Sequence, residues 1–114
     1  MLVPLYNDIK GGKKDRLGPI VVLDVFSGIG SAIVVLKKLG IAISTVISVE
    51  HNPIACWVSK YNHDRSYNHE LKEDGIRYVH EYTTFEELEE NIEGVINEFG
   101  PIDLALGGEY CFFI

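Results

Sequence analysis

The stretch Ile20-Val-Val-Leu-Asp-Val-Phe-Ser-Gly-Ile-Gly30 decides the fold of this chain. Its first seven residues are almost all apolar and rich in β-branched side chains, a pattern typical of a strand buried on both faces of a sheet. Gly28 and Gly30 interrupt this run, and the apolar residues that follow recur at helical spacing as far as Gly40. A strand, a glycine turn and a helix in this order predict the first unit of a parallel α/β sheet.

The same alternation continues along the chain. Short apolar runs predict three more strands, at 45–49, 76–79 and 102–106. Helices are predicted between the strands at about 31–39, 53–61 and 84–99. Asn52 precedes a proline, as at many helix starts. Thr84 with Glu87 three residues later predicts a capping box. We therefore expect a mainly parallel sheet with helices on its faces, connected by right-handed crossovers.

Composition limits the kind of protein that this chain can be. At 114 residues with 46% hydrophobic content it suits one small domain, residues 19–114, after a loose lead-in at 1–18. No apolar run approaches the roughly 18 residues of a membrane span. The net charge of −7 argues against tight, autonomous binding to nucleic acid. Two cysteines make no disulfide framework, so we expect a reducing, intracellular compartment.

The glycine turn Phe26-Ser27-Gly28-Ile29-Gly30 is the first candidate binding site. Glycines between a strand and a helix permit a sharp turn and allow a ligand to approach the main chain. In open α/β sheets, ligands bind beyond the carboxyl ends of the strands. The dinucleotide fingerprint fails because position 33 is Ile rather than Gly. A purely structural turn is the alternative.

An acid at the end of the second strand strengthens the case for a nucleotide cofactor. Glu50 follows the apolar run at 45–49 and can accept hydrogen bonds from both ribose hydroxyls of an adenosine. The alternative is a surface carboxylate. Glu81 ends the third predicted strand, where it meets either an adenine edge or solvent. His51 lies next to Glu50 and either lines the pocket or is a solvated turn residue.

Cys111 lies just past the fourth predicted strand, in a loop that begins with glycine. A cysteine near a cofactor can be a thiolate nucleophile, although a half-buried residue with no such role is the simpler interpretation. Cys56 is expected to pack within its helix. No Cys/His cluster has zinc-ligand spacing, so no metal site is predicted. His63 and His69 fall in a polar stretch and are expected to be solvated.

Together these residues resemble the first four motifs of the DNA (cytosine-5) methyltransferases. The matching segments are Val22-Leu-Asp-Val-Phe-Ser-Gly-Ile-Gly30, Val49-Glu-His-Asn52, Gly100-Pro-Ile-Asp-Leu-Ala-Leu-Gly-Gly108 and Cys111. Leu36-Lys-Lys-Leu-Gly-Ile41 is most similar to the branch that holds the animal de novo and plant domains-rearranged enzymes. The resemblance covers roughly residues 20–111.

The resemblance implies a Rossmann-like sheet that binds S-adenosylmethionine. Phe26, Gly28 and Gly30, with Ser27 and Ile29 between them, would hold the methionine and ribose part. Glu50 would take the ribose hydroxyls, with His51 beside it, and Glu81 stands where the family usually has an Asp at the adenine amino group. Cys111 stands at the nucleophile. In the family mechanism the target cytosine is flipped from the duplex. A thiolate then adds to its carbon 6, and carbon 5 receives the methyl group.

The chain also departs from the family pattern. Glu109 and Tyr110 replace the residues, one of them proline, that normally precede the nucleophile, and a carboxylate near a thiol disfavours the thiolate. The later family motifs and the DNA-recognition segment have no counterpart here, so we expect an incomplete sheet of four strands with three helices. We also expect weak DNA binding and little or no turnover by the chain alone.

A truncated sheet would leave the strand at 102–106 with an open, apolar edge where a protein partner could pair. One alternative function is therefore a non-catalytic regulatory or vestigial module that pairs with a complementary half or a full-length methyltransferase. Another is a small α/β domain that binds a different adenosine ligand. The expected location is intracellular, and the nucleus if the source is eukaryotic.

Overall fold

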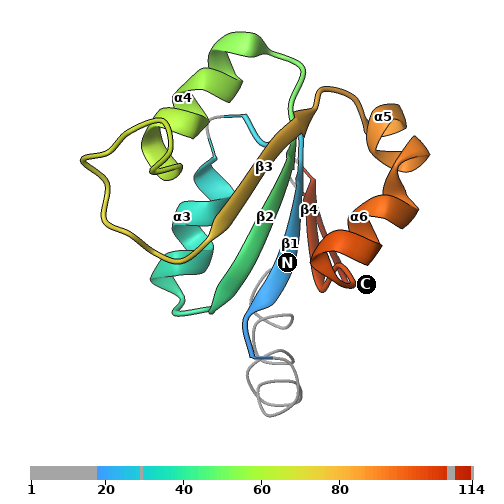
Figure 1. Cartoon of the computed structure of the whole chain (residues 1–114), viewed down its shortest axis with the longest axis horizontal. Helices are drawn as coiled ribbons and strands as arrows, with labels where there is room; N and C mark the ends of the chain where they lie inside the picture. The colour runs from blue at the N-terminus through green and yellow to red at the C-terminus, as the bar shows by residue number, and fades with distance from the viewer. Residues whose placement is uncertain (1–17, 29, 108–109, 114) are drawn as a thin grey trace.

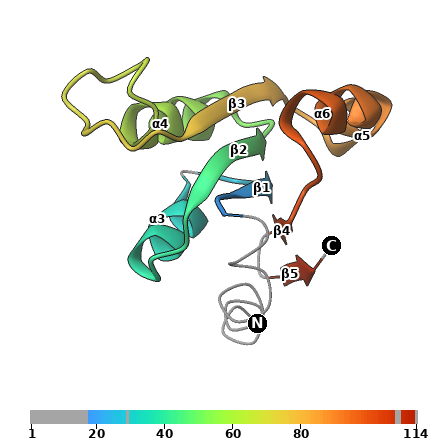
Figure 2. The same cartoon turned by 60° about the horizontal axis from the view of Figure 1, so that its bottom comes forward.

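The computed structural model describes residues 18–28, 30–107 and 110–113. Its centre is a five-stranded sheet with strand order β3-β2-β1-β4-β5, of which Figure 1 labels β1 to β4 and Figure 2 labels β5 as well. The strands are β1 (Ile20–Val25), β2 (Ile43–Val49), β3 (Arg77–Tyr82), β4 (Leu104–Gly107) and β5 (Tyr110–Phe113). The first four strands run parallel, and β5 is antiparallel to β4. The predicted parallel α/β sheet is therefore confirmed.

Helices cover both faces of this sheet. Figure 2 shows one pair of helices on each face. On one face lie α3 (Ser31–Lys38) and α4 (Pro53–His63), and on the other lie α5 (Phe85–Glu90) and α6 (Ile92–Phe99). In the part of the chain that the structure describes, no helix is both long and apolar enough to cross a membrane.

β1 is buried along its whole length because it has a strand on each side and helices on both faces. Leu23 lies opposite Ile47 of β2 and Ala105 of β4. Alternate residues of β1 contact opposite helix layers. The layer beside α3 includes Ile20, Val22, Ile33, Leu36, Val46 and Leu104. The layer beside α5 and α6 includes Val21, Leu23, Val25, Ile47, Leu88 and Val95. Burial of each large apolar side chain contributes about 1.5–3 kcal/mol.

The predicted helix starts are confirmed. The Asn52 side chain accepts hydrogen bonds from the backbone amides of Ile54 and Ala55, at 2.9 and 3.1 Å. Thr84 caps α5 by accepting from the backbone amide of Glu87 at 3.2 Å.

The single helix predicted at 84–99 is wrong, because the chain breaks at Asn91 into α5 and α6. The Asn91 side-chain amide donates to the carbonyl oxygen of Glu87 at 2.8 Å, and its backbone leaves the helical region with φ −111° and ψ 10°. Asparagine competes for backbone hydrogen bonds in this way and disfavours helix interiors.

The prediction of an open edge on the strand at 102–106 is also wrong. β5 pairs with the outer side of β4, with Leu104 opposite Phe113 and Gly107 opposite Tyr110. The aromatic residues Tyr110, Phe112 and Phe113 favour a strand. The edge at which a protein partner was expected is therefore occupied by this chain's own fifth strand.

Candidate functional site

The glycine turn between β1 and α3 has an unusual backbone. Phe26, Gly28 and Gly30 all have positive φ angles, of 56°, 55° and 86°. A bulky residue such as phenylalanine seldom adopts this left-handed conformation, and strain of this kind gathers at functional sites. The Phe26 side chain is 61% exposed, so burial of the ring does not explain the conformation. The amide of Ser27 donates to the carbonyl oxygen of Val49 at 3.2 Å, which ties the turn to the end of β2.

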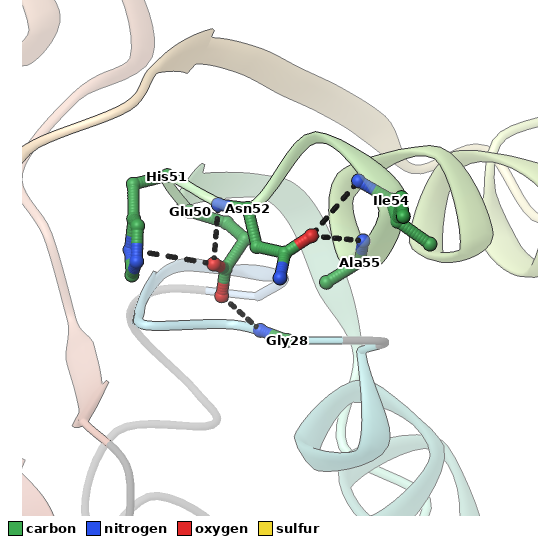
Figure 3. Close-up of polar contacts among 6 residues, drawn as sticks. All are labelled: Gly28, Glu50, His51, Asn52, Ile54 and Ala55. Atoms are coloured by element: carbon green, nitrogen blue, oxygen red, sulfur yellow. Dashed lines mark hydrogen bonds and ion pairs between the residues drawn. The ribbon is translucent and has the colours of Figure 1, made fainter.

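Glu50 joins this turn to the start of α4 (Figure 3). Its Oε1 accepts from the backbone amide of Gly28 at 2.7 Å, and its Oε2 accepts from the backbone amide of Asn52 at 2.9 Å. The side chain of Glu50 is only 9% exposed, whereas that of His51 is 74% exposed. His51 Nδ1 lies 3.6 Å from Glu50 Oε2. Glu50 is therefore a nearly buried acceptor and not a free surface carboxylate.

The two glycines of the turn have different surroundings. Among the described residues, apart from the chain neighbours of Gly28, no atom lies within 4 Å of the position that a Cβ on Gly28 would take. The main chain at Gly28 is therefore open to a ligand. Gly30 is buried, and a Cβ there would collide with side chains of α4. The approach of a ligand at Gly28 stays a prediction with which this open space agrees, whereas packing against α4 explains the glycine at position 30.

Asp24 is a polar residue of this region that sequence reasoning missed. It lies in β1 with 4% exposure, opposite Ser48 of β2, and its Oδ2 has no hydrogen-bond partner among the described residues. Alternation along the strand places it on the same face as Ile20 and Val22. Burial, and secondarily the negative charge of Glu50, raises the pKa of Asp24 to about 7. The signal in the sequence was an acid inside an apolar run.

Glu81 lies within β3 rather than after it, and its side chain is exposed. The pairing of β2 with β3 shifts register here, because Ile47 faces Val79 but Val49 faces Tyr82. Glu81 lines an open cleft of about 490 Å³ together with Lys60, Tyr67 and His80, among other residues.

The prediction that His63 is solvated is wrong, because α4 extends two residues past Tyr61 and His63 is buried at its end. His80, also nearly buried, lies with Nε2 3.1 Å from Asp64 Oδ2. Burial lowers the pKa of both histidines, although for His80 the Asp64 carboxylate opposes this effect. Sequence periodicity gave no signal for these contacts, because they join α4, the loop after it and β3.

Cys111 lies in β5, with its backbone opposite Leu106 of β4, and not in a loop past the fourth strand. The predicted site residue Ile29 and the neighbouring Glu109 lie outside the described residues. Cys56 is a partly exposed free cysteine in α4. Among the described residues no group of three His, Cys, Asp or Glu side chains could hold a metal ion.

Three known proteins to which this chain is similar all carry the name DNA (cytosine-5)-methyltransferase. No protein-family model matches the chain. The DNA (cytosine-5)-methyltransferase DRM2 of Oryza sativa subsp. japonica is 42% identical over 90 residues, which are 79% of this chain and 14% of that protein. DRM1 of Arabidopsis thaliana is 35% identical over 95 residues, 81% of this chain and 14% of that protein. A third, the probable inactive DNA (cytosine-5)-methyltransferase DRM3 of Oryza sativa subsp. japonica, is 29% identical over 90 residues, 78% of this chain and 12% of that protein.

These relatives agree with the branch that the motifs indicated. The chain spans only 12–14% of the length of these three proteins. In sequence, this chain belongs to the DNA (cytosine-5)-methyltransferase family, as a relative of one segment of the plant DRM proteins.

Proposed function

We propose that this chain is the cofactor-binding part of a DNA (cytosine-5)-methyltransferase and that its glycine turn binds S-adenosylmethionine. The contact between Glu50 and the Gly28 amide carries the proposal. A carboxylate has about four lone-pair positions, so the two backbone amides leave Glu50 able to accept from ribose hydroxyls as well.

The acids around the turn suit a positively charged cofactor. S-adenosylmethionine carries a sulfonium and an ammonium group and, when bound, supplies the methyl group. Asp24 has a buried oxygen without a hydrogen-bond partner in the part of the chain that the structure describes, and a nearby cation would favour the charged form of this carboxyl. Gly28 offers open space at its main chain, and Phe26, Ser27, Ile29 and Gly30 complete the turn that would line the methionine and ribose part. His51 and Glu81 are proposed at the ribose and adenine ends.

For the reaction itself, we propose Cys111 as the nucleophile. Its thiolate would form a bond to carbon 6 of a flipped cytosine, which makes carbon 5 able to accept the methyl group that the bound sulfonium supplies. A base would then remove the proton from carbon 5, the bond from Cys111 to carbon 6 would break, and the thiolate would leave with the 5,6 double bond restored. DNA is the proposed substrate and the nucleus the proposed location. The net charge of −7 predicts weak DNA binding by this chain alone, and we expect it to show little turnover.

One observation favours a non-catalytic module as the second candidate. Cys111 pairs with Leu106 within the sheet, and a strand residue is less free than a loop residue to approach a substrate. Covalent trapping on DNA that contains 5-fluorocytosine separates the two candidates. A trapped adduct that Cys111→Ser abolishes supports catalysis, and the absence of an adduct supports the second candidate.

The proposed cofactor site is tested by calorimetric titration of the chain with S-adenosylmethionine. Glu50→Gln is a better probe than Glu50→Ala, because alanine would leave two backbone amides without their acceptor. We expect micromolar binding by the wild type and roughly tenfold to hundredfold weaker binding by Glu50→Gln, as for loss of charged hydrogen bonds. Glu93→Gln, on the exposed surface of α6, is the matched control and should bind as the wild type does.

Circular dichroism of each variant shows whether the fold is retained. A folded wild-type chain that does not bind S-adenosylmethionine would overturn the proposal. Equal affinities for the wild type and a folded Glu50→Gln variant would remove Glu50 from the site.

A further inference from the structure

The Gly30 end of the glycine turn is packed directly against α4. A Cβ at Gly30 would lie 2.7 Å from both Cδ2 and Nε2 of His63 and 2.8 Å from Oγ of Ser59. Both of these α4 side chains are buried. Real Cβ atoms do not approach other atoms so closely, so the imidazole of His63 fits only because residue 30 has no side chain.

The His63 ring also contacts a neighbouring strand. The Tyr78 ring of β3 stacks on it, with centroids 6.4 Å apart and planes 26° apart. The Tyr78 hydroxyl donates to Asp74 Oδ2 at 2.9 Å, and Lys37 of α3 donates to the same oxygen at 2.9 Å. The Lys37 ammonium also lies 5.6 Å from the centroid of the Tyr78 ring. His63 is therefore fixed between the turn and a network that joins α3, β3 and the loop before β3.

Burial and the nearby Lys37 charge favour the neutral form of His63. Burial is the main cause that lowers its pKa, and the positive charge of Lys37 acts in the same direction, as does His80 to a smaller extent. The backbone of Gly30 and the Asp74 carboxylate oppose this effect. Protonation of the ring would place a positive charge in a buried contact near the Lys37 ammonium. A buried charge of this kind is unfavourable, so the protonated ring would either become hydrated or move away from the contact.

We infer that His63 is a positioning residue for the glycine turn: its neutral ring fixes Gly30, and its protonation in acid releases the turn and weakens cofactor binding. The inference rests on the proposed cofactor site. In this inference, His63 does not contact the cofactor itself. Only a few contacts separate His63 from the proposed cofactor site. The Gly30 amide donates to the Ser27 carbonyl at 2.9 Å, and Gly28, between these two residues, donates to Glu50.

The first experiment needs no cofactor and no variant. Backbone amide shifts of Gly28 and Gly30 and the ring shifts of His63 are followed by NMR in the free chain from about pH 8 to pH 5. We expect the Gly30 and Gly28 amides to shift with the midpoint of His63, below the ordinary histidine value. A His63 ring that titrates while the Gly30 amide stays unchanged would overturn the inference.

The second experiment measures S-adenosylmethionine affinity across the same pH range for the wild type, His63→Gln and His69→Gln. Glutamine occupies similar space and cannot take up the proton, and His69 is an exposed histidine of the loop after α4 that serves as the matched control. We expect the wild type and His69→Gln to lose affinity roughly three- to tenfold in acid through His63, and this step to be missing from His63→Gln. Asp24 also titrates, but its contribution is common to all three chains and cancels in the comparison.

An identical acid step in a folded His63→Gln variant would refute the positioning role. If no chain binds S-adenosylmethionine at neutral pH, the proposed function fails instead. The NMR titration still decides whether His63 controls the turn.

Discussion

At the scale of single residues, the site combines two carboxylates that serve different purposes. Glu50 is satisfied by two backbone amides, whereas Asp24 has an oxygen with no partner among the described residues. Buried polar groups without a hydrogen bond are destabilising, and proteins retain them mainly where function requires them. Asp24 is therefore the residue at which stability and function should conflict most clearly.

Replacement of Asp24 by asparagine should stabilise the chain in a pH-dependent way. The pKa of this carboxyl is 3.8 when unperturbed and about 7 in the folded chain. Between these values the folded chain holds a proton that the unfolded chain has lost, so the unfolding free energy of the wild type falls as pH rises and levels off above pH 7. Asp24→Asn should remove this dependence of stability on pH. The variant should have an unfolding free energy higher than that of the wild type by up to about 4 kcal/mol at pH 8, and by little near pH 4.

Urea unfolding of both chains at several pH values checks this prediction. The buried histidines contribute equally to both chains, so the difference between the two curves reports Asp24. An equal gain at every pH would mean that Asp24 is not the titrating group. If Asp24 also faces the cofactor, the stabilised variant should bind S-adenosylmethionine less well, as expected when stability and activity trade off.

At the scale of elements, glycines that look alike in the sequence have different requirements. Gly40, which follows α3, and Gly94, within α6, both have free space where a Cβ would lie. Gly40 has a φ of +75°, whereas Gly94 is helical. Backbone conformation alone therefore distinguishes the two positions.

Gly94→Ala should raise the unfolding free energy by about 0.5–1 kcal/mol, because alanine restricts the unfolded chain and suits a helix. Gly40→Ala should lower it by about 1 kcal/mol, because alanine is strained at positive φ. Thermal unfolding of the two variants beside the wild type provides the comparison. A loss of stability in Gly94→Ala would show that its position in α6 is not regular helix.

The elements also show where sequence reasoning succeeds and where it does not. The strand, glycine turn and helix at 20–39 and the Asn52 cap could be predicted, because each depends on residues close together in the chain. The break at Asn91 could not, because the apolar stripe continues through it and one side-chain hydrogen bond decides the outcome.

For the candidate site, the sequence predicted Glu50 correctly at the end of β2 but could not show that backbone amides already occupy part of it. His63 was missed because its burial depends on contacts with the turn and with β3 that no local pattern encodes. Asp24 carried a signal, an acid in a buried run, that is easily taken for an exception. The pairing of β5 with β4 was missed because four-residue strands are too short for periodicity to identify.

At the scale of the whole molecule, burial is concentrated in the middle of the sheet. β1 and β2 are covered on both faces, whereas β3 lies at an edge and is largely exposed or half-buried. Amides that open only with the whole fold exchange most slowly.

We expect the amides of Val22 and Ile47 to exchange with solvent at least about tenfold more slowly than those of β3, since the edge strand can open locally. Hydrogen exchange followed by NMR measures this order. Protection of Val79 equal to that of Val22 would mean that the sheet opens only as a single unit.

The strand order also determines in which sequence the strands can pair during synthesis of the chain. β1 is central, yet its partner on one side is β4, and Val22 must pair with Leu104 across more than eighty positions of the chain. Such distant pairings form late and slow folding, whereas β1 and β2 are close enough to meet early. As the chain leaves the ribosome, the β4-facing edge of β1 therefore stays uncovered until β4 itself has been synthesised. In that interval the uncovered edge is open to pairing with other chains, so we expect aggregation of the nascent chain to begin at this edge.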